Sequence, residues 1–315
     1  MLRVTRTMRN QPLTRWIARV SLGISFAAVG SASAQQGAGW DPSGSVAVIA
    51  SRFAVTPNLT YLTVLGEDLK LDVFTPRDAS ALAPAPTLLY IHGGGWTGGD
   101  KAVAVPRLVP YLEMGFAVVN INFRLGPAPA AVEDSRCALR WIARNASKYN
   151  FDLKRIVVTG DSSGSHLALT TGLMTPGAGF DEKCAGSDDV RAAAVVSWFG
   201  VTDVDDVIEG VTQKGYASRW LADVADARDL ARRISPIHYV RGDAPAVFTV
   251  HGDDDKVAPY AHATRLHKAL DEVKAPNQLM TIPGGGHGSF KRDEFIRIYA
   301  AIREFLHRRG IVGRP

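Results

Sequence analysis

The chain has 315 residues, of which 46% are apolar and 21% are charged. These fractions are typical of an ordinary globular protein and exclude disordered or collagen-like chains, and the length suits one sizeable α/β domain. No run reaches the roughly 18 uninterrupted apolar residues that would span a bilayer.

The first 34 residues differ in composition from the rest. Five arginines and no acidic residue precede or flank a small, apolar stretch at Val20–Gly30, and Ala32-Ser33-Ala34 follows it. A basic region, an apolar region and a small-residue site in this order predict a secretion signal peptide over residues 1–34. A membrane-anchoring or amphipathic helix is the alternative. We therefore expect an exported protein, periplasmic or secreted.

Loss of that segment would change the net charge. The whole chain has a formal charge of +5, but five of its 36 Lys and Arg residues lie in residues 1–34, which leaves 31 basic against 31 acidic residues. Such a balance gives no support to nucleic-acid binding or to an anionic membrane surface as a partner. We expect an N-terminal leader at residues 35–59 and one catalytic domain at residues 60–315.

From about Tyr61 onward, strand-like and helix-like segments alternate. Strands are predicted where residues alternate in polarity or form short apolar runs, at Leu69–Thr75, Thr87–Ile91, Ala117–Asn122, Arg155–Thr159, Ala192–Val196, Ala246–Val250 and Gln278–Ile282. Helices are predicted at Ala130–Tyr149, Ser163–Leu173, Tyr260–Val273 and Arg292–Arg308. This alternation predicts an α/β doubly wound, mostly parallel sheet with helices on both faces.

The segment 203–232 interrupts this alternation. It is charged, contains Gly210, Gly215 and Trp220, and shows no clear strand pattern. We expect a small cap or lid insertion here, and a solvated connecting helix is the alternative.

Two cysteines, Cys137 and Cys184, are present, without a CxxC motif or a Cys/His cluster that would suggest a metal site. Export would place them in an oxidising compartment, where a disulfide can form. Spacing alone does not decide between a disulfide and two separate buried thiols.

A candidate nucleophile lies in Gly160-Asp161-Ser162-Ser163-Gly164, directly between a predicted strand and a predicted helix. The pattern G-x-S-x-G in this context lifts the central serine above the sheet, and the amides at the start of the helix favour negative charge there. Its position in the pattern favours Ser162 over Ser163.

The run His92-Gly93-Gly94-Gly95-Trp96 follows another predicted strand. Because glycines let backbone N–H groups turn toward a developing oxyanion, we expect an oxyanion hole formed by the N–H groups of Gly94, Gly95 and Ser163. His92 is expected to support the loop. We expect Trp96 to line a substrate pocket together with Trp198, and packing of Trp96 beneath the loop is the alternative.

The base must be a histidine and its partner a carboxylate, both on loops at strand ends. His287 lies in the glycine-rich Gly284–Gly288 beyond the last predicted strand and is the preferred base. Among the other histidines, His262 and His267 are expected at the surface of a charged helix, His166 in packing, and His238 and His251 in loop structure. Three aspartates, Asp253, Asp254 and Asp255, compete for the acid, and at least one should cap the following helix.

From about Thr60 to Leu306 the chain resembles the microbial esterase/lipase group with the HGGG motif, which is related to hormone-sensitive lipase and to feruloyl and acetyl-xylan esterases. The matching motifs are HGGGW at His92–Trp96, GDSSG at Gly160–Gly164, HGDDDKVAP at His251–Pro259 and GGGHG at Gly284–Gly288. The resemblance implies an α/β-hydrolase fold. In the group's HGxxDxxVP pattern the fifth position is the triad acid, which corresponds to Asp255 here.

The resemblance implies a serine carboxylesterase that hydrolyses small esters, of short acyl or aromatic acids, through an acyl-enzyme and with neither a metal nor an organic cofactor. The partner would be a small-molecule ester, or an ester attached to a polysaccharide. Ser165 and Lys256 depart from the group's usual glycine and proline, which leaves the subfamily open. The alternatives are an arylformamidase or a peptidase on the same fold, and a non-catalytic binding module.

Overall fold

The computed structural model describes residues 47, 49–186, 190–210 and 213–314, and the predicted signal peptide lies outside them. Within these ranges the strands form a single sheet in the order β1-β2-β4-β3-β5-β6-β7-β8. Neighbours from β4 to β8 run parallel, whereas β1 and β4 both pair antiparallel with β2. The predicted mostly parallel sheet is therefore present.

The strands are β1 (Phe53–Val64), β2 (Glu67–Pro76), β3 (Ala85–Ile91), β4 (Ala117–Ile121), β5 (Phe151–Asp161), β6 (Ala194–Trp198), β7 (Ala246–Gly252) and β8 (Asn277–Ile282). The α-helices are α2 (Lys101–Glu113), α3 (Ala130–Arg144), α4 (Ala146–Tyr149), α5 (Ser163–Leu173), α6 (Val204–Glu209), α7 (Gly215–Trp220), α8 (Ala227–Arg233), α9 (Ala261–Glu272) and α10 (Arg292–His307), with a 3-10 turn at Pro236–Tyr239. None of these helices combines the length and apolarity that crossing a bilayer requires.

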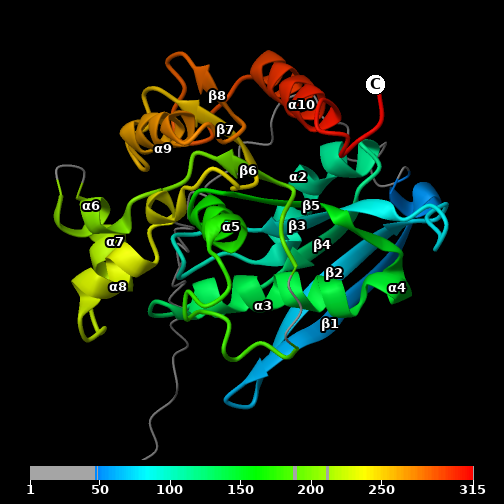
Figure 1. The fold of residues 1–315 in the computed structure, drawn as a ribbon, viewed down its shortest axis with the longest axis horizontal. Coiled ribbons are helices and arrows are strands. Elements are labelled where there is room, and N and C mark those ends of the chain that lie inside the picture. The colour runs from blue at the N-terminus through cyan, green and yellow to red at the C-terminus, as the bar shows by residue number, and fades with distance from the viewer. Residues whose placement is uncertain (1–46, 48, 187–189, 211–212, 315) are drawn as a thin grey trace, which may run out of the picture. The chain divides into compact units, whose positions relative to one another are not determined.

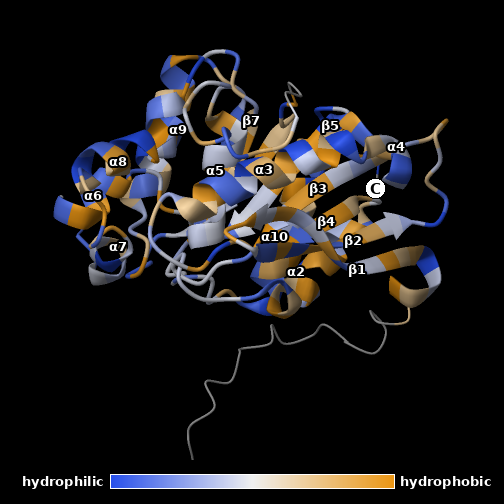
Figure 2. Cartoon of the chain, turned by 90° about the horizontal axis from the view of Figure 1, so that it is seen from below, coloured by the Kyte–Doolittle hydropathy of each residue, from blue (hydrophilic) through white to orange (hydrophobic). Residues whose placement is uncertain are grey.

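Helices cover both faces of the sheet, and each face has its own hydrophobic core. Helices α2 and α10 lie on one side of the sheet and α3 and α5 on the other (Figure 1). Apolar side chains of α2 and α10 belong to one core, and those of α3, α5 and α9 belong to the other. The central strands β4, β6 and β7 are buried along their whole length. In Figure 2 the hydrophobic colours accordingly concentrate on the inner strands, and hydrophilic colours mark α8 and α9. This double coverage explains why the inner strands are apolar runs.

The sheet begins earlier than the sequence predicts. Strand β1 starts at Phe53, inside the segment 35–59 that we interpreted as a leader, and it pairs with β2 over most of its length. As an edge strand it exposes many residues and contains Pro57, so its sequence lacks the apolar run of an inner strand. The boundary at residue 60 is therefore wrong.

Helix α2 is also absent from the sequence prediction. It contains Pro106 and Pro110, which usually indicate a helix end because proline cannot donate a backbone hydrogen bond. The helix begins at a regular cap, since Asp100 accepts a hydrogen bond from the backbone of Ala102 at 2.7 Å. Burial of Leu108, Leu112 and their neighbours against the sheet outweighs the cost of the prolines.

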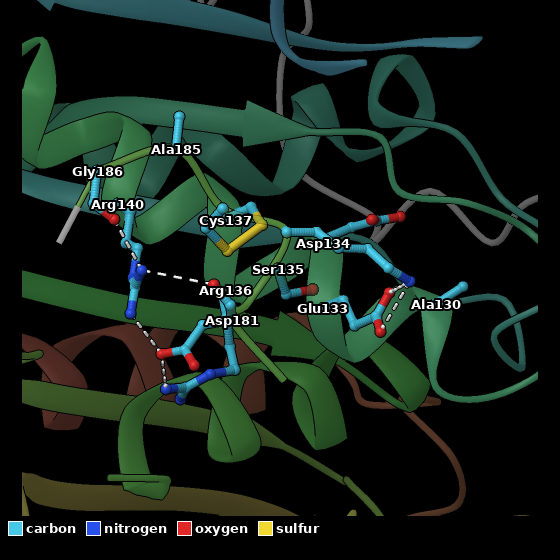
Figure 3. The surroundings of a disulfide bond; sticks show 12 residues. Ala130, Glu133, Asp134, Ser135, Arg136, Cys137, Arg140, Asp181, Ala185 and Gly186 are labelled. Carbon is cyan, nitrogen blue, oxygen red and sulfur yellow. Dashed lines mark hydrogen bonds and ion pairs between the residues drawn. A yellow bond between two sulfur atoms is a disulfide. The ribbon is translucent and has the colours of Figure 1, made fainter. Parts of the chain in front are cut away.

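A disulfide joins Cys137 of α3 to Cys184, which settles the alternative that the sequence left open. Ion pairs surround it, as Figure 3 shows: Asp181 lies 2.8 Å from Arg136 and 2.6 Å from Arg140, both on α3. The disulfide and these pairs fasten the segment after α5 to α3.

The segment 203–232 forms three short helices, α6, α7 and α8, between β6 and β7. They are not merely solvated, because Trp220 and Leu230 belong to the core beside α3 and α5. We call residues 203–232 the cap segment. Its helix α7 is tied to neighbouring loops by hydrogen bonds from Tyr216 to the carbonyl of Val257 and from the backbone of Ala128 to Trp220.

Candidate active site

Ser162 sits at a sharp turn between β5 and α5. Its φ of 55° and ψ of −120° lie outside the regions that side-chain-bearing residues normally adopt. A Cβ at Gly164 would clash with the carbonyl oxygen of Ile91, so glycine at this position lets α5 approach the end of β3. The turn lies where the strand order reverses, between β3 and β5, which is the usual ligand crevice of open α/β sheets.

Asp161, immediately before the serine, is held from two sides. It accepts a hydrogen bond from the hydroxyl of Tyr90 at 2.9 Å and one from Arg107 at 2.7 Å. Its carboxylate also contacts Gly93, where a Cβ would lie only 2.7 Å away. Asp161 therefore links β3, α2 and the glycine loop to the turn that carries Ser162.

Ser162, His287 and Asp255 form a continuous chain of hydrogen bonds, although they are far apart in sequence. The Oγ atom of Ser162 lies 2.7 Å from Nε2 of His287, and Nδ1 of the same ring lies 2.7 Å from Oδ2 of Asp255. Because an ionised carboxylate only accepts hydrogen bonds, the proton belongs on Nδ1. Nε2 is then free to accept the proton of the serine hydroxyl, as a general base must.

Asp255 is buried and fully hydrogen-bonded. Its Oδ1 accepts the backbone N–H groups of Val257 and Ala258, at 2.8 and 2.9 Å. Burial alone would raise the pKa of Asp255, but hydrogen bonds from His251 and His287 hold that pKa well below its ordinary value. The carboxylate therefore stays ionised near neutral pH and can stabilise a positively charged His287.

The other two aspartates of this loop have different partners. Asp253 accepts the backbone N–H of Gly284 at 2.6 Å, and Asp254 pairs with exposed Lys256 at 2.5 Å. Neither one touches His287, and none of the three caps α9, whose N-cap residue Tyr260 makes no side-chain capping bond. The expected aspartate cap is therefore wrong.

Ser163 lacks the surroundings of a nucleophile. Its side-chain oxygen is buried and has no hydrogen-bond partner among the described residues. Of the two adjacent serines, only Ser162 has its hydroxyl next to a histidine.

The glycine loop adjoins the serine turn. Gly94 has a φ of 129°, which only glycine adopts readily, and its backbone is exposed. The N–H groups of Gly94, Gly95 and Ser163 donate no hydrogen bond to any described residue. They are thus available to a ligand. His92 supports the loop as expected: its Nδ1 lies 2.8 Å from the carbonyl of Gly93, and its ring stacks on Phe123.

The structure places both predicted pocket tryptophans in the core. Trp96 is 0% exposed and stacks on Trp220 of the cap segment with 4.1 Å between ring centroids. The alternative, that Trp96 packs beneath its loop, is therefore correct. Trp198 is 6% exposed and donates from Nε1 to the hydroxyl of Tyr111 at 3.0 Å. Neither indole is a pocket wall in this arrangement.

The aromatic ring that adjoins the hydrogen-bonded site residues is that of Phe199. It meets His287 edge-on, with 4.8 Å between centroids. Its φ of 41° is unusual for a bulky residue, so the backbone after β6 is bent to present it. Sequence reasoning missed Phe199, and only its position directly after the β6 strand could have indicated it.

Two of the histidines lie where the sequence did not place them. His262 and His267 are 0% and 5% exposed, so the surface location expected for them is wrong. They lie on the inner side of α9, where the backbone N–H of Thr202 donates to Nδ1 of His262 and Nδ1 of His267 lies 2.6 Å from the side-chain oxygen of Asn277. Burial lowers the pKa of both, so they are neutral packing residues.

Ser165 stands where the HGGG group usually has glycine, and the core accommodates its larger side chain. Its hydroxyl hydrogen-bonds with that of Ser197 at 2.7 Å, and it is fully buried. Gly200 leaves room for it, because a Cβ there would lie only 2.5 Å from the Ser165 oxygen.

In the described part of the chain, no three His, Cys, Asp or Glu residues are grouped so that they could hold a metal ion.

Comparison with known proteins agrees with this geometry. Esterase LipQ of Mycobacterium tuberculosis is 28% identical over 76% of this chain and 59% of its own length. The probable carboxylic ester hydrolase LipM of the same organism is 30% identical over 69% of this chain and 52% of its own. The chain thus spans somewhat more than half the length of these curated relatives.

Solved structures extend the likeness to the fold. A truncated carbohydrate esterase from gut microbiota superposes with a TM-score of 0.70 at 28% identity, covering 82% of this chain and 96% of that one. Butyrate-bound esterase 2 of Thermogutta terrifontis superposes with a TM-score of 0.71 at 22% identity over 84% and 96% of the two chains, and so shares the fold. The predicted α/β-hydrolase fold is confirmed.

The BD-FAE family model matches residues 71–270. This range runs from β2 to α9 and includes the glycine loop, the serine turn and the loop with Asp255. The chain belongs to the BD-FAE family.

Proposed function

We propose that the protein is a serine carboxylesterase in which Ser162 is the nucleophile, His287 the general base and Asp255 the residue that orients it. The hydrogen-bond chain through these three side chains is the observation that carries the proposal. The curated relatives named as esterases support the same reaction class.

The reaction follows from the hydrogen bonds. Ser162 Oγ attacks the ester carbonyl carbon while Nε2 of His287 takes the hydroxyl proton. When the tetrahedral intermediate collapses, His287 returns this proton to the leaving alcohol. Water then attacks the acyl-enzyme by the same route in reverse. Asp255 keeps the ring in the correct tautomer and stabilises its positive charge.

The oxyanion of each tetrahedral intermediate would lie among the N–H groups of Gly94, Gly95 and Ser163. Their lack of partners among the described residues supports this assignment. A donor of this kind typically lowers the barrier by roughly 2.7–4 kcal/mol.

We place the substrates among small esters of short-chain or aromatic carboxylic acids, including esters attached to polysaccharides. The structural similarity to a carbohydrate esterase supports the last of these.

We also propose export, with residues 1–34 as a cleaved signal and a periplasmic or extracellular destination. The disulfide supports this, since disulfides persist in oxidising compartments. N-terminal sequencing of the protein from fractionated cells tests it: a mature chain beginning at Gln35 outside the cytoplasm is expected, and an intact chain retained in the cytoplasm would contradict it.

The activity is tested with p-nitrophenyl esters from acetate to decanoate, with Ser162→Ala as the control. Fast cleavage of the acetate and butyrate that disappears in the variant is the expected result. Activity that survives in Ser162→Ala would assign the reaction elsewhere, and absence of hydrolysis with every ester would remove support for a general esterase.

A further inference from the structure

The carboxylate of Asp255 is held at one oxygen and faces the imidazole with the other. Its Oδ2 lies 2.7 Å from Nδ1 of His287. Its Oδ1 accepts the backbone N–H groups of Val257 and Ala258, at 2.8 and 2.9 Å. Because these bonds fix the orientation of the carboxylate group, they also fix the direction in which Oδ2 meets the ring. Whatever holds the two peptide units that supply these N–H groups therefore holds the acid.

The cap segment bonds to the carbonyl end of each of these peptide units. Nζ of Lys214 donates to the carbonyl oxygen of Lys256 at 2.9 Å, and this carbonyl belongs to the same peptide unit as the N–H of Val257. The hydroxyl of Tyr216 donates to the carbonyl oxygen of Val257 at 3.1 Å, and this carbonyl shares its peptide unit with the N–H of Ala258. A peptide unit is planar and trans, so its C=O and N–H point in opposite directions and turn together. A donor bound at the oxygen thus fixes where the N–H points.

The same contacts favour the ionised form of Asp255. A hydrogen bond accepted by a carbonyl polarises its amide and strengthens the N–H as a donor, and the bond from the Lys214 ammonium group is charge-assisted. Burial raises the pKa of this carboxyl group, but hydrogen bonds from His251, His287 and the backbone of Val257 hold the pKa well below its ordinary value. By strengthening the bond from Val257, Lys214 acts in the same direction.

The cap segment is a firm support for these two side chains. The backbone N–H of Lys214 donates to the carbonyl of Val207 in α6 at 2.8 Å. Tyr216 lies on α7, and its ring packs against that of Trp96 with 5.8 Å between centroids. The same helix ends at Trp220, which is 1% exposed. Packing in the core therefore sets the position of both donors relative to the loop that carries Asp255.

We propose that Lys214 and Tyr216 are positioning residues that hold the carboxylate of Asp255 in the orientation that His287 requires. The inference rests on the proposed function and gives the cap segment a part in the reaction that needs no contact with the substrate. Loss of either side chain would free one peptide unit to turn, and the carboxylate would turn with it.

The test removes each donor with little change of shape. Tyr216→Phe deletes the hydroxyl and keeps the ring that packs against Trp96. Lys214→Met keeps the alkyl chain and deletes the charge, whereas Lys214→Arg retains a cationic donor. Tyr239→Phe is the matched control, because the hydroxyl of Tyr239 also donates to a backbone carbonyl, that of Arg233 at 2.7 Å, but not in the loop of Asp255.

With p-nitrophenyl butyrate, Tyr216→Phe and Lys214→Met should each lower kcat roughly three- to tenfold, the range of one lost hydrogen bond, with KM unchanged. Lys214→Arg should retain most of kcat, and Tyr239→Phe should match the wild type. The melting temperatures of Tyr216→Phe and Tyr239→Phe should be similar, since each variant loses one bond between a hydroxyl and a carbonyl.

A double-mutant cycle separates the positioning of Asp255 from other effects. In an Asp255→Ala background no carboxylate remains to be held, so Tyr216→Phe should leave the residual kcat unchanged. The full loss in this background, or wild-type kcat in both Tyr216→Phe and Lys214→Met, would overturn the proposal. An equal loss of kcat in Tyr239→Phe would also overturn it, because the effect would then come from general destabilisation. A kcat for Lys214→Arg as low as that for Lys214→Met would overturn the role of Lys214.

Failure of the proposed reaction is recognised separately. A wild type without Ser162-dependent hydrolysis of p-nitrophenyl butyrate would contradict the proposed function and this inference with it. An active wild type together with unimpaired variants would overturn the inference alone.

Discussion

The indole N–H of Trp96 donates a hydrogen bond to Nδ1 of His166 at 3.0 Å. The other nitrogen of this imidazole lies 2.8 Å from the carbonyl of Ile234, directly after α8. A neutral ring with its proton on Nε2 satisfies both contacts, whereas a protonated ring could no longer accept from Trp96. One buried histidine thus connects the glycine loop to Ile234, just after the cap segment.

This contact predicts a loss of stability in mild acid. Burial lowers the pKa of His166 from 6.5 to about 4, so between these pH values the unfolded chain binds more protons than the folded chain. The stabilising contribution is therefore full above about pH 6.5 and is lost as the pH falls toward 4, by roughly 3 kcal/mol at most.

Urea unfolding at a series of pH values measures this loss, with His166→Asn as the comparison. Asparagine retains an acceptor and does not titrate, so the variant should show a shallower decline over the same range. An identical slope in both proteins would assign the effect to other groups such as His262, whose pKa burial also lowers.

The hydrogen bonds of Asp255 and Asp253 predict very different losses of kcat when each aspartate is replaced by asparagine. Asp255→Asn should reduce kcat by a factor on the order of 10⁴, because the amide favours the wrong tautomer of His287. Asp253→Asn should cost far less, since Asp253 bonds only to the backbone of Gly284. Steady-state kinetics with p-nitrophenyl butyrate compares them, and a milder effect for Asp255→Asn would reject the present assignment of the acid.

His251 is expected to be a positioning residue for Asp255. Its Nε2 lies 2.8 Å from the carbonyl of Ala258 and 3.3 Å from Oδ2 of Asp255, the same oxygen that binds His287. His251→Leu would remove both contacts, and a lost hydrogen bond to a charged group costs about 1.5–3 kcal/mol, so kcat should fall at least tenfold.

His251→Gln, which keeps an N–H donor near that position, is the matched variant and should restore most of kcat. The two variants would be compared by kcat and KM separately and by thermal melting. Similar losses of kcat in both, at equal melting temperatures, would show that the N–H group of His251 does not matter.

Loss of the disulfide, which includes none of the proposed catalytic residues, should greatly lower the free energy of unfolding. Cys137 and Cys184 are separated by 47 residues, and closing a loop of that length constrains the unfolded chain by about 4 kcal/mol. The Cys137→Ala/Cys184→Ala double variant should unfold at correspondingly lower urea, while a reductant should have no further effect on it. Unchanged stability would mean that the ion pairs of Asp181 hold the segment without the disulfide.

The sequence is sufficient for the inner part of the fold and for the hydrogen-bonded site residues. Buried parallel strands need apolar runs, and a serine on a strained turn needs glycine neighbours, so β3 to β8 and Ser162 have recognisable patterns. His287 follows from its glycine-rich loop. Asp255 does not follow from chemistry alone, because three adjacent aspartates have equal acidity and only the backbone of the loop selects one.

The errors occur where tertiary packing overrides local pattern. Strand β1 is an exposed edge, and α2 contains two prolines, so neither has the local signal of its class. The charged residues of α9 conceal the burial of His262 and His267, since those rings face the sheet. Trp96 looks like a pocket residue in sequence because its partner, Trp220, is more than a hundred residues away and outside any local pattern.

The central claim, that Ser162 is a nucleophile activated by His287, is tested most directly by covalent labelling with paraoxon. An organophosphate reacts with an activated serine without depending on the natural alcohol or acyl group. We predict one phosphoryl group, located by peptide mass spectrometry on Ser162, with no labelling in Ser162→Ala and greatly slowed labelling in His287→Ala. Labelling at another residue, or an unlabelled wild-type protein, would contradict the account.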